Sequence, residues 1–217
     1  MRGPRGRHRR RGDGRARRRR RRRREVRRRL GGGDPAQRRG LPRQPEAPLS
    51  PLVVLVGPPA AGKSTVAEAL ASRLGVGFRD TDADVEARAG VPVSEIFIDQ
   101  GEAHFRTLEE EAVAAALAEH DGVLALGGGA VLSDATRALL AGHRVVFLDV
   151  GLAAGVSRVG MNGNRPLLLG NVRSQMKALM DRRRPLYDEV ARFTIVTDDL
   201  DPTQVVDQVV RLVEEDR

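Results

Sequence analysis

The chain reads Gly57-Pro58-Pro59-Ala60-Ala61-Gly62-Lys63-Ser64-Thr65 directly after a short apolar run, Leu52–Val56. This is the pattern G-x-x-x-x-G-K-[ST] of a phosphate-binding loop, which connects a buried strand to the first turn of a helix. Apolar residues recur with helical spacing from residue 62 to residue 74, so the required context is present. The backbone N–H groups of such a loop and the helix N-terminus form a concave anion site. The stretch therefore predicts a P-loop that holds the phosphates of a nucleotide.

The residues of the loop have separate expected roles. Lys63 would reach the β- and γ-phosphates, and the Ser64 hydroxyl would ligate Mg²⁺. We expect further contacts to ATP from Ala60, Ala61, Gly62 and Thr65. Glycine is common at the position of Ala60. If the residue there must adopt a positive φ, alanine destabilises the folded loop by about 1 kcal/mol.

Short β-rich runs alternate with helical patterns along residues 51–217, which is typical of a parallel sheet covered by helices on both faces. Strands are predicted at 52–56, 77–79, 123–126, 145–149 and 193–196. Helices are predicted at 62–74, 101–120, 134–140, 172–190 and 202–214. A further helix is predicted after the strand 145–149 and ends at about residue 159. We therefore predict an α/β fold: a three-layer, doubly wound, five-stranded parallel sheet of the P-loop kinase type.

Charge is distributed unevenly along the chain. The 38 basic and 29 acidic residues give +9, but residues 1–50 alone hold 21 arginines and four acidic residues, a net +17. The remaining 17 basic and 25 acidic residues leave −8 on the rest. Residues 17–24 are eight consecutive arginines, and a segment with so little apolar surface cannot offset its ordering entropy. We expect a disordered tail over 1–50 and a folded domain over 51–217.

Three interpretations of the tail remain open. It could bind RNA, DNA or acidic surfaces through counterion release, it could be an inert solvated segment, or it could be upstream DNA translated from a start codon placed too early. An RNA binder that acts by base stacking would require aromatic residues between the arginines, and there are none. We therefore favour the last two interpretations and expect at most nonspecific contacts with nucleic acid.

Composition excludes several classes of protein. The absence of cysteine rules out a disulfide scaffold, a thiol nucleophile and a Cys-based zinc site. The four histidines are scattered and show no metal-ligand spacing. Apolar runs are too short to cross a bilayer, and no apolar segment follows the arginine block as a secretory signal requires. We expect a cytoplasmic protein without membrane contact.

A P-loop alone does not define a reaction. GTPases share it, but the sequence contains no N-K-x-D motif for reading guanine. A folded part of this length with a Gly/Asn-rich segment at about 160–171, suited to closing as a lid, favours a small-molecule kinase. Asp80-Thr81-Asp82 follows the second predicted strand, at the sheet edge where the P-loop also lies. By itself, an Asp-rich turn or a helix cap would look the same.

Taken together, the motifs resemble those of the shikimate kinase family. They follow the family's order over essentially all of 51–217: the P-loop, Asp80-Thr81-Asp82, Ile96-Phe97 with Gly101-Glu102 and Phe105-Arg106, Leu126-Gly127-Gly128-Gly129, Arg165-Pro166-Leu167-Leu168, and Arg183 with Pro185 and Tyr187. Only the P-loop is a strong signal alone, but the series is specific. The arginine-rich tail has no counterpart in the short members of the family.

The resemblance implies a reaction and the groups that carry it out. The reaction would be ATP-dependent phosphorylation of the 3-hydroxyl of shikimate, giving shikimate 3-phosphate and ADP on the way to chorismate and the aromatic amino acids. Asp82 would bind the acceptor hydroxyl as base or orienting group, and Asp80 would support Mg²⁺ with Ser64. Lys63 and Arg165 would join Asp82 as catalytic groups, with Arg165 closing over the phosphates and Arg158 lying over the adenine.

Further substrate contacts are implied by the same resemblance. Arg106 and Arg183 would hold the shikimate carboxylate, which suits the planar fork of guanidinium groups. The spacing to Pro185 and Tyr187 selects Arg183 from three consecutive arginines. Backbone N–H groups at Gly128 and Gly129 would approach the substrate, and Phe97 and Phe105 would wall the pocket.

Several of these residues could instead have ordinary structural roles. The two arginines could lie on solvated helix faces, and the phenylalanines could be core residues. A related P-loop kinase could act on gluconate or on a nucleoside monophosphate, although one Tyr, five Phe and no Trp offer few stacking residues. A nucleic-acid-associated factor acting through the tail is the alternative from another class. We expect a monomer.

Overall fold

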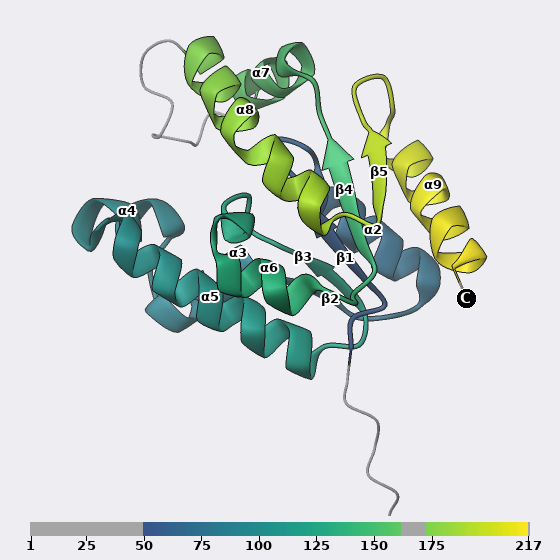
Figure 1. The fold of residues 1–217 in the computed structure, drawn as a ribbon, viewed down its shortest axis with the longest axis horizontal. Coiled ribbons are helices and arrows are strands. Elements are labelled where there is room, and N and C mark those ends of the chain that lie inside the picture. The colour runs from purple at the N-terminus through teal and green to yellow at the C-terminus, as the bar shows by residue number, and fades with distance from the viewer. Residues whose placement is uncertain (1–49, 162–171, 217) are drawn as a thin grey trace, which may run out of the picture. The chain divides into compact units, whose positions relative to one another are not determined.

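A computed structural model describes residues 50–161 and 172–216 of the chain (Figure 1). The strands within these residues are β1 (Val53–Val56), β2 (Phe78–Asp80), β3 (Val123–Ala125), β4 (Val145–Asp149) and β5 (Phe193–Val196). The helices are α2 (Lys63–Leu74), α3 (Thr81–Ala89), α4 (Val93–Asp99), α5 (Gly101–Glu119), the 3₁₀ helix η2 (Ala130–Leu132), α6 (Asp134–Leu140), α7 (Leu152–Met161), α8 (Val172–Val190) and α9 (Pro202–Glu215). None of these helices is long and apolar enough to cross a membrane.

The strands form one parallel sheet in the order β2-β3-β1-β4-β5. β1 lies at its centre, where Val54 is paired with Leu124 of β3 on one side and with Val145 of β4 on the other. Because all the strands run the same way, their carboxyl ends meet at one edge of the sheet. The P-loop lies at this edge, as ligand sites do in doubly wound sheets.

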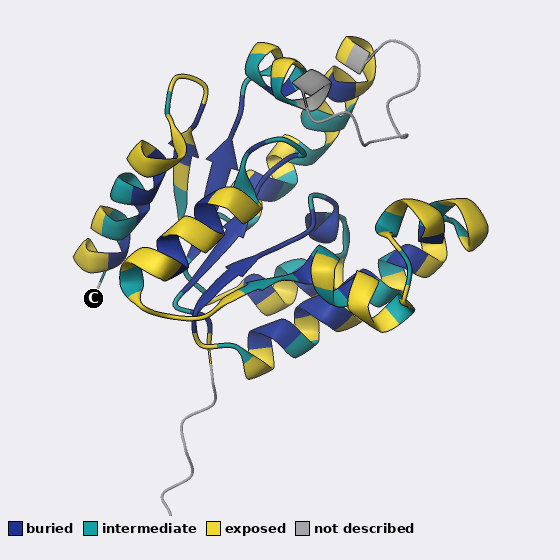
Figure 2. Ribbon diagram, turned by 180° about the vertical axis from the view of Figure 1, so that it is seen from behind, coloured by how far each residue is buried: buried dark blue, intermediate teal, exposed yellow. Residues whose placement is uncertain are grey.

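Helices cover both faces of the sheet, which confirms the predicted three-layer fold. Alternate strand residues such as Val53 and Leu55 pack in one core with α2 and α9. The intervening residues, such as Val54 and Val56, pack in a second core with α5, α6, η2 and α8. Figure 2 shows the central strands as buried and the outward faces of the helices as exposed. The period of two along each strand supplies both faces with apolar side chains.

The structure departs from the sequence prediction between residues 80 and 100, where it contains α3 and α4 in place of an unassigned segment. The side chain of Asp80 caps α3 by accepting a hydrogen bond from the Asp82 N–H at 2.9 Å. Gly90 ends that helix with a φ of 74°, and Pro92 precedes the first turn of α4. α7 continues to Met161, so the first residues of the expected lid are helical, and residues 162–171 lie outside the described part.

Candidate active site

The P-loop connects β1 to α2 and is tightly confined by β4. Gly57 has a φ of 150°, and a methyl group on it would lie 2.5 Å from the carbonyl oxygen of Leu148. Ala60 adopts the left-handed conformation, with a φ of 65°, which costs an alanine about 1 kcal/mol. No side chain among the described residues caps the N-terminus of α2, and its N-cap residue is Gly62. The helix therefore offers its first N–H groups to an anion.

Lys63 and Ser64 extend the loop toward the neighbouring strand ends. The Lys63 ammonium donates to the carbonyl oxygens of Gly57 at 2.9 Å and Pro58 at 3.1 Å, so it lies over the loop itself. The Ser64 hydroxyl donates to Asp80 Oδ2 at 2.6 Å. The Ser64 hydroxyl, which follows β1, and the Asp80 carboxylate, at the end of β2, therefore lie together across the end of β3. Of the other loop residues, Ala61 is buried and Thr65 is exposed in the first turn of α2.

Two carboxylates converge on the glycine turn that follows β3. Asp82 is half-buried in the first turn of α3, and Glu109 is buried on α5. A methyl group on Gly127 would collide with Asp82 Oδ1 and would lie 2.5 Å from Glu109 Oε1. The Gly127 N–H donates to the hydroxyl of Thr81 at 3.0 Å, which fixes the turn against α3. Asp82 therefore faces the same point as a second acidic group.

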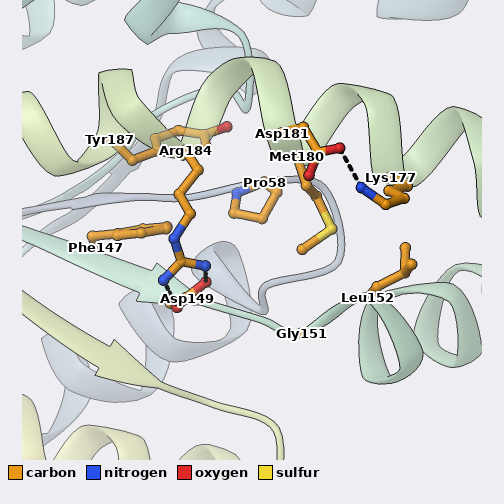
Figure 3. Close-up of a pocket in the computed structure, with 10 residues that line it drawn as sticks. All are labelled: Pro58, Phe147, Asp149, Gly151, Leu152, Lys177, Met180, Asp181, Arg184 and Tyr187. Carbon is orange, nitrogen blue, oxygen red and sulfur yellow. Dashed lines mark hydrogen bonds and ion pairs between the residues drawn. The ribbon is translucent and has the colours of Figure 1, made fainter.

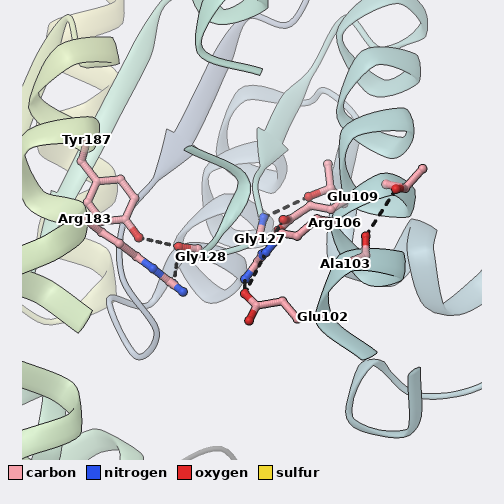
Figure 4. A network of polar contacts seen from close by, with 10 residues as sticks. Glu102, Ala103, Arg106, Glu109, Gly127, Gly128, Arg183 and Tyr187 are labelled. Carbon is pink, nitrogen blue, oxygen red and sulfur yellow. Dashed lines mark hydrogen bonds and ion pairs between the residues drawn. The ribbon is translucent and has the colours of Figure 1, made fainter. Parts of the chain in front are cut away.

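Arg106 is held in place by the acidic neighbours Glu102 and Glu109 on α5 (Figure 4) and by aromatic neighbours on α4 and α5. Its Nη1 donates to Glu109 Oε2 at 2.6 Å and its Nη2 donates to Glu102 Oε1 at 2.9 Å. The guanidinium carbon lies 5.3 Å from the ring centroid of Phe105 and 5.9 Å from that of Phe97. Burial lowers the pKa of Arg106, but the charge of Glu109 and the hydrogen bonds to both glutamates outweigh this and raise it above its ordinary value. The side chain is therefore a fixed cation.

Glu109 is a functional candidate that the sequence analysis did not identify. Its side chain is 3 % exposed, and its Oε1 has no hydrogen-bond partner among the described residues. Burial raises the pKa of its carboxyl above the ordinary value, although Arg106 pulls it down, and the nearby charge of Asp82 adds to the rise. A buried carboxyl oxygen without a partner is costly and calls for an explanation. Its place beside Asp82 and Arg106 supplies one.

The helix α8 reaches the other side of the glycine turn (Figure 4). Arg183 Nη1 donates to the carbonyl oxygen of Gly128 at 2.8 Å, and the Tyr187 hydroxyl donates to the same oxygen at 2.6 Å. Burial raises the pKa of Tyr187 to about 12, so its hydroxyl remains a donor at neutral pH. A methyl group on Gly128 would lie 3.3 Å from Pro59 Cδ, which places this turn against the P-loop.

Close approach also explains the third glycine of the turn. A methyl group on Gly129 would overlap the guanidinium group of Arg106. Arg106 on α5 and Arg183 on α8 therefore flank residues 127–129 from two directions. The triple glycine thus permits close packing of polar groups, beyond any role as a turn.

The remaining predicted site residues lie elsewhere or outside the described part. Arg158 on α7 donates to the carbonyl oxygen of Thr197 at 2.6 Å, which attaches it to the loop after β5 rather than to the glycine turn. Phe97 is partly buried and Phe105 is buried, and their ring centroids are 4.6 Å apart. Arg165 lies outside the described residues. The structure thus brings together Ser64, Asp80, Asp82, Arg106, Gly127–Gly129 and Arg183 at one edge of the sheet.

A P-loop on a doubly wound parallel sheet, facing carboxylate and guanidinium groups across one edge, defines the class of P-loop small-molecule kinases. Comparison with known proteins narrows the class. A family model described as shikimate kinase matches residues 59–214. Shikimate kinases of Salinispora arenicola and Saccharopolyspora erythraea are 60 % and 59 % identical over 76 % and 78 % of this chain, and the matches cover 99 % and 97 % of those proteins.

Solved structures agree with the sequence comparisons. The structure of shikimate kinase from Acinetobacter baumannii in complex with shikimate is 34 % identical, has a TM-score of 0.73, and the match covers 78 % of this chain and 95 % of that one. Shikimate kinase from Bacteroides thetaiotaomicron is 29 % identical with a TM-score of 0.69, over 76 % of this chain and 97 % of that one. The chain belongs to the shikimate kinase family.

Proposed function

We propose that this chain transfers the γ-phosphoryl group of ATP to the 3-hydroxyl of shikimate. A bond forms between the hydroxyl oxygen and the γ-phosphorus, the bond from that phosphorus to the β,γ-bridging oxygen breaks, and the hydroxyl loses its proton. Membership of the family and the shikimate complex of the Acinetobacter relative support the substrate. The observation that carries the proposal is the convergence of Asp82 and Arg106 on the glycine turn, which itself packs against the P-loop.

On the acceptor side, Asp82 orients the hydroxyl and accepts its proton, because it faces the glycine turn from the first turn of α3. Arg106 and Arg183 bind the substrate carboxylate from opposite sides of that turn. The backbone of Gly128 and Gly129 approaches the ring, and Phe97 and Phe105 wall the pocket, where their rings also contact the Arg106 guanidinium. The charges are thus fixed before the substrate arrives, which lowers the cost of binding it in one orientation.

On the nucleotide side, the loop residues Ala60 to Thr65 bind the phosphates through backbone N–H groups. Lys63 exchanges its contacts with the carbonyl oxygens of Gly57 and Pro58 for contacts with the β- and γ-phosphates. Arg158 contacts the adenine from the neighbourhood of the loop after β5. Arg165 neutralises charge on the migrating phosphoryl group.

Magnesium fits the oxygen groups of Ser64 and Asp80. These are hard ligands of the type that Mg²⁺ prefers, and they lie 2.6 Å apart. Within residues 50–161 and 172–216, no group of three or more His, Cys, Asp or Glu side chains forms a metal site. The ion would therefore be held jointly with the nucleotide, and it would neutralise charge on the phosphates.

A coupled assay of ADP release tests this function, with shikimate, gluconate and nucleoside monophosphates offered as acceptors. We expect turnover with shikimate, and we expect Lys63→Ala to abolish it because the cation at the phosphates is lost. Turnover with shikimate no higher than in the Lys63→Ala control would contradict the proposal. Preference for another acceptor would assign the chain a different substrate within the same class.

Glu109 is proposed as a positioning residue for Arg106. Replacing it with glutamine removes the charge that holds Nη1, so the KM for shikimate should rise about tenfold, since a hydrogen bond between charged groups contributes about 1.5–3 kcal/mol. Steady-state kinetics check this, with Glu110→Gln, an exposed neighbour, as the matched control. An unchanged KM in Glu109→Gln would contradict the role.

The raised pKa of Glu109 also predicts how folding stability depends on pH. A carboxyl whose pKa is higher in the folded than in the unfolded state binds more protons when folded. Its contribution to stability is present below the ordinary pKa and is lost as the pH rises through the folded one. Denaturant unfolding of wild type and Glu109→Gln across mildly acidic pH should show this loss in the wild type only. Parallel pH profiles would contradict the assigned shift.

Gly129→Ala provides an independent test of the position of Arg106. Gly129 has a φ of −104°, which alanine tolerates, but the new methyl group would displace the guanidinium group. Because the far end of a long side chain can move, we expect nearly unchanged thermal stability and a shikimate KM raised about tenfold, as for other losses of charged hydrogen bonds. Gly155→Ala is the control, because its new methyl group would meet no atom of the described residues closer than 3.8 Å. Equal KM values in both variants would contradict the placement.

We also propose that residues 51–217 form the kinase domain and act as a cytoplasmic monomer, and that the arginine-rich tail takes no part in the reaction. The proposed acceptor-binding groups Asp82, Arg106 and Arg183 all belong to residues 51–217, and the family model matches residues 59–214. A chain beginning at residue 48 should have the same kcat as the full chain, and only the full chain should show salt-dependent binding to RNA. A loss of kcat on truncation would contradict this division.

A further inference from the structure

The two neighbouring arginines Arg183 and Arg184 fasten α8 to different strands. Arg183 donates to the carbonyl oxygen of Gly128, in the turn that follows β3. Arg184 donates through Nη1 to Asp149 Oδ1 at 3.1 Å and through Nη2 to Asp149 Oδ2 at 2.6 Å, at the end of β4 (Figure 3). In the sheet, β3 and β4 lie on either side of β1, which leads into the P-loop. α8 is therefore attached on both sides of the P-loop by consecutive residues.

The contact between Arg184 and Asp149 is better defined than an ordinary surface ion pair. Both nitrogens of the fork meet both oxygens of the carboxylate, which fixes direction as well as distance. The Asp149 side chain is only 10 % exposed, whereas that of Arg184 is 55 % exposed. The guanidinium carbon also lies 6.0 Å from the ring centroid of Phe147. A partly buried pair of this geometry restrains the helix more than an exposed one would.

Asp149 itself is a rigid point of attachment. It is the last residue of β4, and its carbonyl oxygen accepts a hydrogen bond from the Thr197 N–H at 2.8 Å. The preceding residue, Leu148, places its carbonyl oxygen against Gly57 at the start of the P-loop. Through Asp149, α8 is therefore attached to β4, the strand whose backbone confines the start of the P-loop.

We infer that Arg184 is a positioning residue, which through Asp149 holds the adjacent Arg183 in the orientation that binds the acceptor carboxylate. This inference rests on the proposed function, because it needs Arg183 to contact the substrate. Because Arg184 directly follows Arg183 in α8, a restraint on Arg184 also restrains the backbone of Arg183. Arg182, the exposed residue on the other side of Arg183, makes no ion pair with the described residues and cannot do this.

The test removes the pair without leaving a buried charge. Arg184→Ala alone would leave the Asp149 carboxylate unpaired beside the P-loop and would disturb the nucleotide site as well. The double variant Arg184→Ala/Asp149→Asn avoids this. We expect its shikimate KM to rise about threefold to tenfold, as for the loss of a bidentate charged contact, with kcat and the ATP KM within about twofold of wild type. Arg182→Ala is the matched control and should match wild type in all three.

A second variant keeps the test open if the double variant fails to fold. Arg184→Lys retains the positive charge but not the fork, so it should also raise the shikimate KM selectively. An unchanged shikimate KM in a folded variant would overturn the inference. Equal rises of both KM values with a lower melting temperature would overturn it too, because they would mark a merely structural contact. Turnover of the wild type, measured in the same experiment, tests the proposed function. The ratio of the shikimate KM of the variant to that of wild type tests the inference.

Discussion

Replacing Asp82 with asparagine should lower kcat with shikimate by about 100-fold to 10 000-fold, the range over which a positioned acid–base group accelerates proton transfer. Asparagine keeps the shape of the side chain but cannot accept the proton of the hydroxyl. Asp82 is half-buried beside the glycine turn, and the loop that binds the nucleotide is formed by other residues. The affinity for ATP should therefore remain close to that of wild type. Steady-state kinetics and calorimetric titration with ATP measure the two quantities.

The matched control for this variant is Asp121→Asn, which changes an exposed carboxylate in the same way far from the carboxyl edge of the sheet. It should leave both quantities unchanged. Turnover by Asp82→Asn at the wild-type rate would remove Asp82 from the reaction. A parallel loss of ATP affinity would assign it instead to the nucleotide or to its metal ion.

The second large effect is expected from Arg106→Lys. Lysine keeps the charge but offers a single ammonium in place of the planar fork, which here also contacts Glu102 and Glu109. The loss of one charged hydrogen bond to the substrate carboxylate costs about 1.5–3 kcal/mol, which raises the shikimate KM by about tenfold to a hundredfold. The kcat should change much less, because the role proposed for Arg106 is to bind the substrate carboxylate and not the hydroxyl that reacts. Kinetics over a wide range of shikimate concentration separate the two parameters.

Arg73→Lys is the control, because Arg73 is 61 % exposed and meets Asp207 only at 3.8 Å. Its kinetics should equal those of wild type. If Arg106→Lys behaved in the same way as Arg73→Lys, Arg106 would be an ordinary side chain on the face of a helix.

Much of the fold could be predicted because its signals are local. The apolar run before Gly57 and the helical spacing after it define the strand, loop and helix of the P-loop, and the structure confirms them. The five strands and their parallel arrangement also follow from short β-rich runs that alternate with helical patterns. α3 was missed because it is a nine-residue, mostly polar helix in which only Thr81 and Val85 are buried, so it shows little apolar periodicity. Asp80, which caps this helix through Oδ1, also accepts a hydrogen bond from Ser64 through Oδ2, and a sequence does not show that one residue makes both contacts.

Glu109 could not be singled out from the sequence for a different reason. It belongs to the run Glu109-Glu110-Glu111, in which only the first glutamate is buried. Which member turns inward depends on how α5 packs against α3 and the glycine turn, and this is a tertiary property. The spacing of three residues between Arg106 and Glu109 indicates that the two can meet on one helix face. It does not indicate that their contact is buried next to Asp82.

The most direct measurement is the structure of this chain in complex with shikimate and a non-hydrolysable ATP analogue. The 3-hydroxyl of shikimate should lie about 2.6–3.2 Å from the Asp82 carboxylate, the distance required for proton transfer, and should face the γ-phosphorus. The shikimate carboxylate should contact Arg106 and Arg183, and Lys63 should contact the β- and γ-phosphates. A complex in which Asp82 and Arg106 lay away from the substrate, or on the far side of the sheet edge from the triphosphate, would contradict the proposed site.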